Sequence, residues 1–310
     1  MNKNEAKILF MGTPDIARDC LAQLIEDGWN IIGAFTREDK PVGRKQIMTA
    51  PPVKQLALEH NIPVYQPKTL KGEYSDVIAQ LAPDMIVVVA FGRILPKAVI
   101  DVPQFGCLNL HVSLLPQYRG AAPIQWSLIN GDAQTGVTVM HIDEGLDTGD
   151  IIDVLPIAID PDENSEELFE KVTEQGKAFL SKVMENVVSG DYTRTPQDHE
   201  KATLAPPLTK EMALFSFEED ALVLHNKIRG QNPWPSAYFM FEDKKVKVLK
   251  AKVMPESGKP GEILSTKPLV IAAGTKSLQL ITVQPEGGKA MDGTAWAAGR
   301  RFKKGDSVVK

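Results

Sequence analysis

The chain has 310 residues, of which 43% are hydrophobic, so it is long enough to build two domains with apolar cores. It contains no run of about eighteen apolar residues, and its first ten residues resemble a strand rather than a signal peptide, so we expect a soluble, cytoplasmic protein. Only two cysteines are present and the five histidines are scattered, which argues against a disulfide framework and against a bound metal.

The first 150 residues alternate short apolar runs with helix-like stretches. This alternation predicts a parallel sheet with helices on both faces. Strands are predicted at residues 7–11, 31–36, 64–66, 85–90, 107–110 and 137–142. Helices are predicted to start near Asp15, Pro52, Gly72, Pro96 and Ala122. With a further strand at 151–159 and a long helix that starts at Asn164 or Ser165 and runs to about Val188, we predict a Rossmann-like, mostly parallel α/β domain over residues 1–189.

Residues 190–207 contain turn formers, charges and prolines without periodicity, and we interpret them as a linker. The remaining residues, 208–310, begin with a predicted helix at 219–229. Short alternating runs follow at 237–241, 245–253, 261–265, 269–273 and 278–283. Several short strands separated by Gly and Pro predict a C-terminal OB-like β-barrel domain.

Charge is divided unevenly between these parts. Residues 1–207 carry 18 Lys or Arg against 29 Asp or Glu, a balance of −11, whereas residues 208–310 carry 17 against 11, a balance of +6. The basic C-terminal part either adds solubility or follows the backbone of a polyanion such as a nucleic acid.

The turn after the first strand does not match the glycine-rich fingerprint of a dinucleotide site. That fingerprint needs glycines at its first, third and sixth places, but here Gly12 is followed by Pro14 and Ala17. The turn is therefore either a tight connection with proline at the helix start or a substrate contact.

Three polar residues carry the chemistry that we expect. Asn109 and His111 alternate along a predicted strand and so share one face, and Asp147 lies between two glycines in the loop after the next strand. We expect both strands to deliver these groups at their carboxyl ends, where open α/β sheets bind ligands. Asn109 and a protonated His111 can donate hydrogen bonds to an oxyanion, while Asp147 can hold the imidazole and accept a proton from an amine. The set predicts attack of an amine on a carbonyl carbon; the alternative is that His111 is a structural histidine.

The segment NxHxSLLPxxxG, followed by GLDTG, resembles the signature of the enzymes that transfer formyl groups from 10-formyltetrahydrofolate. Asn109, His111 and Asp147 fall on the catalytic positions of that family. The similarity continues in GTPDIA, DKPVGRKQIMTAPPVK, AAPIQWSLINGD and RGQNPWPSAYF, and is greatest to the members that act on methionyl-tRNA. It implies a 10-formyltetrahydrofolate co-substrate, no metal and methionyl-initiator tRNA as the acceptor, and we expect a monomer.

The resemblance also implies which residues contact the folate: Arg93, Ile94, Leu95, Ser113, Leu114, Leu115, Pro116 and Asp143. One position departs from the family, where an aromatic residue is usual at the place of Ile16 and helps to receive the methionine side chain. The shape of the methionine pocket is therefore left open.

Residues 37–54 form a basic loop in an otherwise acidic domain, with five Lys or Arg residues against Glu38 and Asp39. By charge alone, this loop is either a solvated surface or a polyanion contact. In the related tRNA enzymes a corresponding loop enters the acceptor arm, so the resemblance makes Arg37, Arg44 and Lys45 candidate tRNA contacts.

The stretch RGQNPWPSAYF allows two interpretations. We favour a packed domain junction, because Trp and Pro pack well, and the alternative is part of the tRNA surface. Its four notable residues are Arg229, Asn232, Trp234 and Pro235.

Two other functions remain as rivals. A sugar-nucleotide formyltransferase would pair a similar catalytic domain with a small second domain, but would need neither the basic loop nor the basic C-terminal part. A non-catalytic nucleic-acid-binding protein could use a degenerate version of the fold, but the intact set of Asn109, His111 and Asp147 argues against it.

Overall fold

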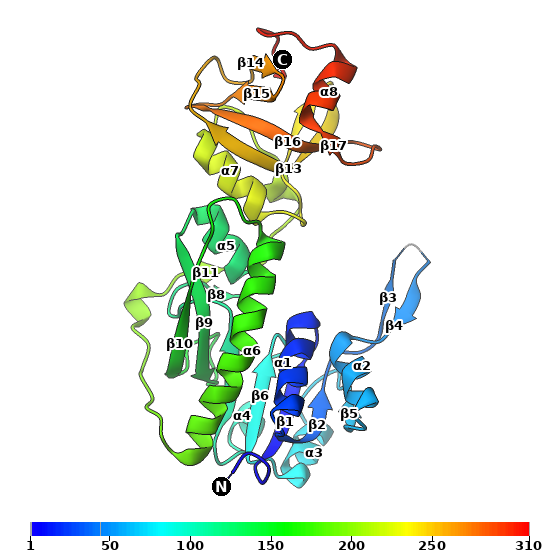
Figure 1. The fold of residues 1–310 in the computed structure, drawn as a ribbon. Coiled ribbons are helices and arrows are strands. Elements are labelled where there is room, and N and C mark those ends of the chain that lie inside the picture. The colour runs from blue at the N-terminus through cyan, green and yellow to red at the C-terminus, as the bar shows by residue number, and fades with distance from the viewer. Residues whose placement is uncertain (1, 44, 310) are drawn as a thin grey trace. The chain divides into compact units, whose positions relative to one another are not determined.

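The computed structural model describes residues 2–43 and 45–309, which form two compact units (Figure 1). The N-terminal unit contains the chain up to Gly120 together with residues 136–157 and 170–204. The C-terminal unit contains residues 121–135, 158–169 and the chain from Ala205 onward. Each unit is therefore assembled from segments that lie far apart in the sequence.

The N-terminal unit is built on a seven-stranded sheet in the order β10-β9-β7-β6-β1-β2-β5. The strands are β1 (Lys7–Gly12), β2 (Asn30–Phe35), β5 (Val64–Tyr65), β6 (Met85–Val89), β7 (Cys107–His111), β9 (Gln134–His141) and β10 (Ile151–Ala158). The pairs from β5 to β7 are all parallel, which confirms the predicted mostly parallel sheet. At the other side of β7 the direction changes, because β9 runs antiparallel to β7.

Helices cover both faces of this sheet, and they begin within a residue of the predicted starts. They are α1 (Asp15–Glu26), α2 (Pro52–Glu59), α3 (Glu73–Leu81), α4 (Lys97–Ile100) and the long α6 (Ser165–Ser189). Leu9 and Met11 of β1 pack in one core with apolar residues of α3 and α4. The alternate residues of β1, Ile8 and Phe10, are also fully buried. Because both sides of the strand are covered, the strand sequence is continuously apolar instead of alternating.

A small hairpin extends beyond the edge of this sheet (Figure 1). Its strands, β3 (Lys40–Val42) and β4 (Ile47–Thr49), pair antiparallel with each other, and all six of their residues are exposed. The sequence predicted only a basic loop here, since Pro41 and the polar flanks conceal any strand pattern.

Further short elements are β8 (Arg119–Gly120), β11 (Leu204–Ala205) and two turns of 3-10 helix, His199–Lys201 and Glu211–Ala213.

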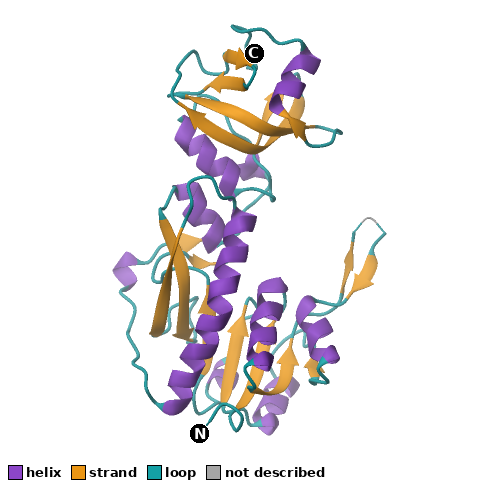
Figure 2. Ribbon diagram, in the orientation of Figure 1, coloured by secondary structure: helices purple, strands orange, loops and turns teal. Residues whose placement is uncertain are grey.

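The C-terminal unit is mostly antiparallel sheet (Figure 2). Its strands are β12 (Tyr238–Phe241), β13 (Lys244–Met254), β14 (Ile263–Thr266), β15 (Leu269–Ala272), β16 (Ser277–Pro285) and β17 (Met291–Asp292). Its helices are α5 (Pro123–Asn130), α7 (Ala221–Gly230) and α8 (Gly293–Arg300), and α5 packs against α7. The predicted C-terminal β domain is thereby confirmed, although α8 was not foreseen.

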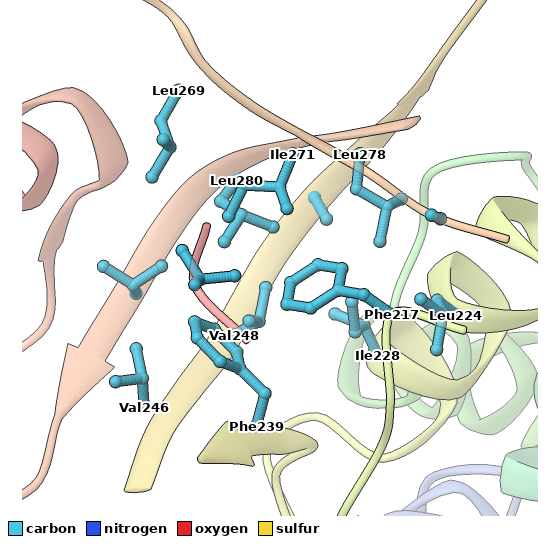
Figure 3. Packing of buried hydrophobic residues seen from close by; sticks show 14 of the residues in the cluster. Phe217, Leu224, Ile228, Phe239, Val246, Val248, Leu269, Ile271, Leu278 and Leu280 are labelled. Carbon is cyan, nitrogen blue, oxygen red and sulfur yellow. The ribbon is translucent and has the colours of Figure 1, made fainter. Parts of the chain in front are cut away.

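A single apolar core holds the C-terminal unit together (Figure 3). Phe217, Phe239 and Leu224 reach it from a loop, a strand and a helix, and all three are at most 2% exposed. Trp296 of α8 joins them edge-on, with its ring centroid 6.1 Å from that of Phe239. Burial of such side chains stabilises the unit by about 25 cal/mol for each Å² of apolar surface removed from water.

None of the helices within residues 2–43 and 45–309 combines the length and the apolar character that a membrane crossing requires.

Candidate active site

Strand β7 carries the first two site residues. Asn109 is partly buried and His111 is 6% exposed, and they lie on the same side of the strand. Within the described chain, no group forms a hydrogen bond with the side-chain amide of Asn109. Its two N–H groups are therefore free to donate to a ligand oxygen.

The imidazole of His111 is oriented by a backbone carbonyl. Its Nε2 lies 2.9 Å from the carbonyl oxygen of Tyr118, and because a carbonyl only accepts, Nε2 must carry a proton. Its Nδ1 lies 3.7 Å from Oδ2 of Asp147, which is too far for a hydrogen bond. The ring is thus fixed at one nitrogen while the other still faces the carboxylate without being bound to it.

Asp147 occupies a conformation that few residues with a side chain adopt. Its φ is +53°, in the left-handed region, which costs about 1–2 kcal/mol for an L-residue, less for Asp than for most. Oδ2 accepts a hydrogen bond of 2.8 Å from the backbone N–H of Gly120, and the side chain is 15% exposed. The surrounding contacts therefore hold the carboxylate beside His111 at some cost in backbone strain.

The loop around Asp147 is shaped by its own polar groups. Oδ1 of Asp143 accepts hydrogen bonds from the backbone of Gly145 at 2.9 Å and from the hydroxyl of Thr148 at 2.6 Å. Gly149 passes so close to His141 that a Cβ at this position would overlap the His141 carbonyl oxygen. The second glycine of GLDTG is thus required by a close backbone approach, and Asp143 braces the turn in front of it.

The structure corrects the reason that we expected for this meeting of residues. β9 is antiparallel to β7, and its last residue, His141, pairs with Leu108 near the start of β7. We predicted that the loop after β9 would leave from the carboxyl edge of the sheet, and the structure shows that it does not. The loop must instead return along β7 to bring Asp147 to His111. Asn109, His111 and Asp147 do come together, through loop folding instead of through parallel strand ends.

Residues 113–116 form a turn that is tied to β9. The hydroxyl of Thr138 donates to the carbonyl of Ser113 at 2.7 Å and accepts from the backbone of Leu115 at 3.1 Å. The Ser113 hydroxyl is fully buried and donates to the carbonyl of Gln117 at 2.7 Å, so it is committed to the turn. The Leu115–Pro116 peptide is cis, and Leu114 and Pro116 remain partly exposed. These last two side chains are the members of the segment that a ligand can reach.

The second candidate folate segment, Arg93 to Leu95, is held by one ion pair. Nη2 of Arg93 lies 2.9 Å from a carboxylate oxygen of Glu38, and Nη1 binds the carbonyl of Lys68. A hydrogen bond from its own backbone amide, and then Arg93, hold the pKa of Glu38 below its usual value. Leu95 is buried in the core, whereas Ile94 is 86% exposed. The exposed Ile94 therefore offers apolar surface beside a fixed guanidinium.

Two of the candidate tRNA residues, Arg37 and Lys45, lie before the hairpin and in its turn. Lys45 is exposed, and Arg44 lies outside the described residues. Arg37 is partly buried, and a Cβ on Gly92 would stand 3.4 Å from its Nη1. The hairpin also exposes three apolar residues, Val42, Ile47 and Met48, each by more than half.

The base of the hairpin is anchored more firmly than its strands. Nζ of Lys54 lies 2.8 Å from Oδ1 of Asp39, and Gln66 donates to that same oxygen at 2.9 Å. Hydrogen bonds from Lys54 and Gln66 lower the pKa of Asp39. The direction in which the hairpin leaves the sheet is therefore fixed at its root.

Sequence reasoning missed Gln197, which the predicted linker contains. It is 6% exposed, and its amide Nε2 donates to the carbonyls of Asp147 at 2.9 Å and Gly149 at 2.8 Å. Its Oε1 accepts from Nε of Arg119 at 3.2 Å and from Nη2 at 2.6 Å. An isolated glutamine in a polar, aperiodic segment gives no signal of burial, so only the structure reveals this contact.

The turn at the end of β1 packs closely against β6 and α1. A Cβ on Gly12 would approach the carbonyl of Val89 to 2.9 Å and would also meet the side chain of Ala17. Ile16, at the place where the family usually has an aromatic residue, is 3% exposed. These contacts account for the glycine by packing alone.

Arg229 of the RGQNPWPSAYF stretch is a buried cation within the C-terminal unit. It donates to Oδ1 of Asn226 at 2.9 Å and to the carbonyls of Asp160 and Glu163 at 3.3 and 3.4 Å, and burial lowers its pKa. Trp234, in contrast, is 53% exposed. The two residues thus have different environments, with the arginine packed and the tryptophan ring open.

No cluster of three His, Cys, Asp or Glu residues suited to a metal ion exists among residues 2–43 and 45–309. Both cysteines are buried, and burial raises the pKa of Cys20 and of Cys107 to about 12. Neither thiol is therefore an activated nucleophile.

Comparison with known proteins places two family models on the chain. The model described as Formyl transferase matches residues 6–184, and the model described as Formyl transferase, C-terminal domain, matches residues 207–301. A Geobacter sulfurreducens protein named methionyl-tRNA formyltransferase is 42% identical over 302 residues, which covers 96% of this chain and 95% of the relative. A Clostridioides difficile protein of the same name is 48% identical over 251 residues, 81% of each chain.

Solved structures share the fold at lower identity. An N-formyltransferase from Helicobacter canadensis, in complex with folinic acid and dTDP-3-aminofucose, has a TM-score of 0.67 and 18% identity, and the match covers 89% of this chain and 99% of that one. HypX from Aquifex aeolicus, in complex with tetrahydrofolic acid, has a TM-score of 0.62 and 17% identity. That match covers 98% of this chain and 50% of HypX, so the chain spans about half the length of HypX.

Proposed function

Because the chain belongs to the formyl transferase family, we propose that it transfers the formyl group of 10-formyltetrahydrofolate to the α-amino group of methionyl-initiator tRNA. The observation that carries this proposal is the near full-length similarity to proteins named methionyl-tRNA formyltransferase, at 40–48% identity. The product, formylmethionyl-tRNA, is the form used to start translation.

In the proposed reaction the free donors of the site stabilise negative charge on the formyl oxygen. The α-amine attacks the formyl carbon, a C–N bond forms, and the carbonyl oxygen becomes an oxyanion. The amide of Asn109, which has no hydrogen-bond partner among the residues that the structure describes, and Nδ1–H of a protonated His111 are the donors assigned to this oxygen. Removal of one such donor typically costs about 10²–10³ in rate, so two of them account for much of the catalysis.

Asp147 is assigned to the proton of the attacking amine. Within the described part of the chain the carboxylate accepts one hydrogen bond, from Gly120, so it keeps lone pairs for the amine or for a bridging water. As the C–N bond to the folate breaks, the proton passes to the departing folate nitrogen. The same carboxylate lies beside the His111 ring, with Oδ2 3.7 Å from Nδ1.

The proposed folate site combines the residues named by resemblance. Arg93 with Ile94 and Leu95, the segment Ser113–Pro116, and Asp143 all belong to the N-terminal unit. The reduced folates present in structures of the same fold support such a co-substrate.

The tRNA is assigned to two basic surfaces, one on each unit. The residues assigned to the surface of the N-terminal unit are Arg37, Arg44 and Lys45, in and next to the hairpin segment of the sequence. On the C-terminal unit, β13 places Val246 and Val248 in the core, so that the lysines on either side point outward. Such a lysine-bearing strand follows a phosphate backbone by counterion release and does not read bases.

The experiment that tests the proposal is a formylation assay with purified protein, 10-formyltetrahydrofolate and either initiator or elongator methionyl-tRNA. We expect formyl transfer to the initiator and much less to the elongator, with a rate that falls steeply as salt rises. Absence of transfer to either tRNA, or efficient transfer to an amino sugar nucleotide with little dependence on salt, would reject the proposal.

A further inference from the structure

We propose that Gln197 is a positioning residue for the reaction, which holds the Asp147 carboxylate at its working distance from His111. This inference rests on the proposed function for its chemistry. Gln197 lies in the segment that follows α6, fifty residues after Asp147 in the sequence, and it is more than nine-tenths buried. It contacts no reacting atom that we have assigned, so it would act through the loop that carries Asp147.

The amide nitrogen of Gln197 clamps both ends of the strained part of this loop. One N–H binds the carbonyl of Asp147 at 2.9 Å and the other binds the carbonyl of Gly149 at 2.8 Å. A left-handed φ of +53° at Asp147 persists only where neighbouring contacts determine it. The two bonds from one amide group fix the peptide plane before Thr148 and the one after Gly149, and so the direction in which the Asp147 side chain leaves the backbone.

The amide oxygen of Gln197 binds the segment of Arg119 and Gly120, which also contacts the Asp147 carboxylate. It accepts two hydrogen bonds from the guanidinium of Arg119, whose neighbour Gly120 donates its backbone N–H to the Asp147 carboxylate at 2.8 Å. Gln197 therefore bridges the loop that carries the carboxylate and the segment that binds it.

The chain after Gln197 reinforces this bridge. Thr203 accepts the backbone N–H of Tyr118 on its hydroxyl and that of Arg119 on its carbonyl, both at 2.8 Å. Tyr118 also has a left-handed φ, of +60°, and its carbonyl orients the His111 ring. The segment 197–203 thus braces the two strained residues that set the positions of the carboxylate and the imidazole.

Only a primary amide meets these requirements. The two carbonyls of the loop accept and the guanidinium donates, so the partner needs two N–H groups at one end and an acceptor at the other. A glutamate at this position would keep the acceptor but would place an oxygen, in place of the amide nitrogen, against the two carbonyls, with a charge close to Asp147. A methionine would fill the same space without any of the four hydrogen bonds.

The kinetic test compares Gln197→Met and Gln197→Glu with the unmodified full chain in the methionyl-tRNA assay. We expect kcat to fall about 10- to 100-fold, because small misplacements of a catalytic group have effects of this size. KM for the folate and for methionyl-tRNA should each change less than about threefold, since Gln197 contacts neither substrate in the proposal. An unchanged kcat in both variants, or a loss confined to KM, would overturn the inference.

A double variant distinguishes positioning from general damage. If Gln197 acts through the carboxylate, then Asp147→Asn with Gln197→Met should be no slower than Asp147→Asn alone, within about twofold. Losses that multiply would show that Gln197 acts elsewhere. The matched control is Gln231→Met, because Gln231 is 1% exposed in the C-terminal unit and its amide also binds a backbone carbonyl, that of Met212. This control should lower thermal stability while keeping kcat within about threefold.

Hydrogen exchange tests the same inference without any substrate. In Gln197→Met the backbone amide of Gly120, which binds the Asp147 carboxylate, and the amides of residues 143–149 should exchange at least about tenfold faster. In Gln231→Met they should not. Unchanged exchange in Gln197→Met would refute the clamp, even if the wild-type chain formylates methionyl-tRNA. Faster exchange in Gln197→Met, together with a wild-type chain that lacks formylation activity, would reject the proposed function and keep the clamp.

Discussion

Two loops of the N-terminal unit serve the proposed reaction in opposite ways. The loop from Asp143 to Gly149 is braced by side-chain hydrogen bonds from within and by Gln197 from outside. The hairpin of β3 and β4 is exposed at all six strand residues and is anchored at its base, where Asp39 contacts Lys54 and Gln66. In the loop from Asp143 to Gly149, a strained backbone at Asp147 fixes the position of one carboxylate. The hairpin instead presents cationic and apolar side chains to solvent.

Under the proposed function, the contrast follows from what each loop would recognise. A proton transfer depends on the position of one atom to within a few tenths of an ångström, so its donors and acceptors must be oriented before the substrate arrives. A phosphate backbone is recognised mainly by charge, which acts over a Debye length of about 10 Å and tolerates flexible side chains. Substitutions in the two loops should therefore change different kinetic parameters.

The largest effect is expected at Asp147. Asp147→Asn keeps an oxygen for the N–H of Gly120 and still tolerates a left-handed φ, but removes the negative charge. We expect kcat to fall about 10²–10⁴-fold with little change in melting temperature, as for loss of a general base. The control is Asp153→Asn, an exposed carboxylate on β10, which should retain full activity. A loss of less than about threefold at Asp147 would show that its charge is not needed.

The next effect concerns stability at the root of the braced loop. His141 is 6% exposed, and burial, followed by the charge of Arg194, lowers its pKa to about 4. Between pH 6.5 and 4 the unfolded chain binds a proton at this residue that the folded chain does not. Folding stability should therefore decrease as pH falls through this window, by up to about 3 kcal/mol, and the loss should level off below pH 4.

The comparison that isolates this effect uses His141→Phe. The variant has no titrating group at the position. Between pH 7 and pH 4 its free energy of unfolding should therefore fall by about 3 kcal/mol less than that of the unmodified chain. Denaturant titrations of both proteins at several pH values measure the difference. Parallel pH curves for the two proteins would mean that His141 is protonated as readily in the folded chain as in the unfolded one.

A smaller loss of stability is expected at Gly149. Gly149→Ala adds a Cβ that overlaps the His141 carbonyl, so the backbone must shift by an amount that costs about 1–3 kcal/mol. Because the Gly149 carbonyl also binds Gln197, the shift should reach Asp147 and lower kcat. Gly190→Ala, which has open space around it but a φ of +82°, controls for a simple glycine replacement away from the loop. An active Gly149→Ala protein of normal stability would contradict the rigidity inferred for the loop.

The elements with regular patterns could be read from the sequence. Continuous apolar runs predicted β1 and β6, and the alternation of apolar and polar residues predicted β7 and placed Asn109 and His111 on one face. The helix starts were marked by Pro52 and by Asn164, whose side chain accepts from the backbone of Glu166 and Glu167. These features depend on local periodicity and capping, which a single sequence contains.

The parts that were not foreseen depend on contacts between distant segments. Nothing local distinguishes β9 as antiparallel, since its apolar run is the same for either direction. The burial of Gln197 depends on Arg119 and on a loop fifty residues earlier in the chain. Helix α8 was hidden by its two glycines, although Asp292 caps it by accepting from Thr294 and Ala295. Tertiary partners therefore decide what periodicity leaves open.

The smallest effect is expected at the hairpin. Lys45 is exposed in the turn between β3 and β4, so Lys45→Ala removes little packing and should leave the melting temperature unchanged. Loss of one phosphate contact should raise KM for methionyl-tRNA a few-fold and lower the slope of log KM against log salt by about 1, with kcat nearly constant. Lys71→Ala, an exposed lysine of the same unit before α3, should change neither quantity. If Lys45→Ala instead lowered kcat at saturating tRNA, the hairpin would have to contribute to the chemical step, and the division between a braced catalytic loop and an exposed recognition hairpin would fail.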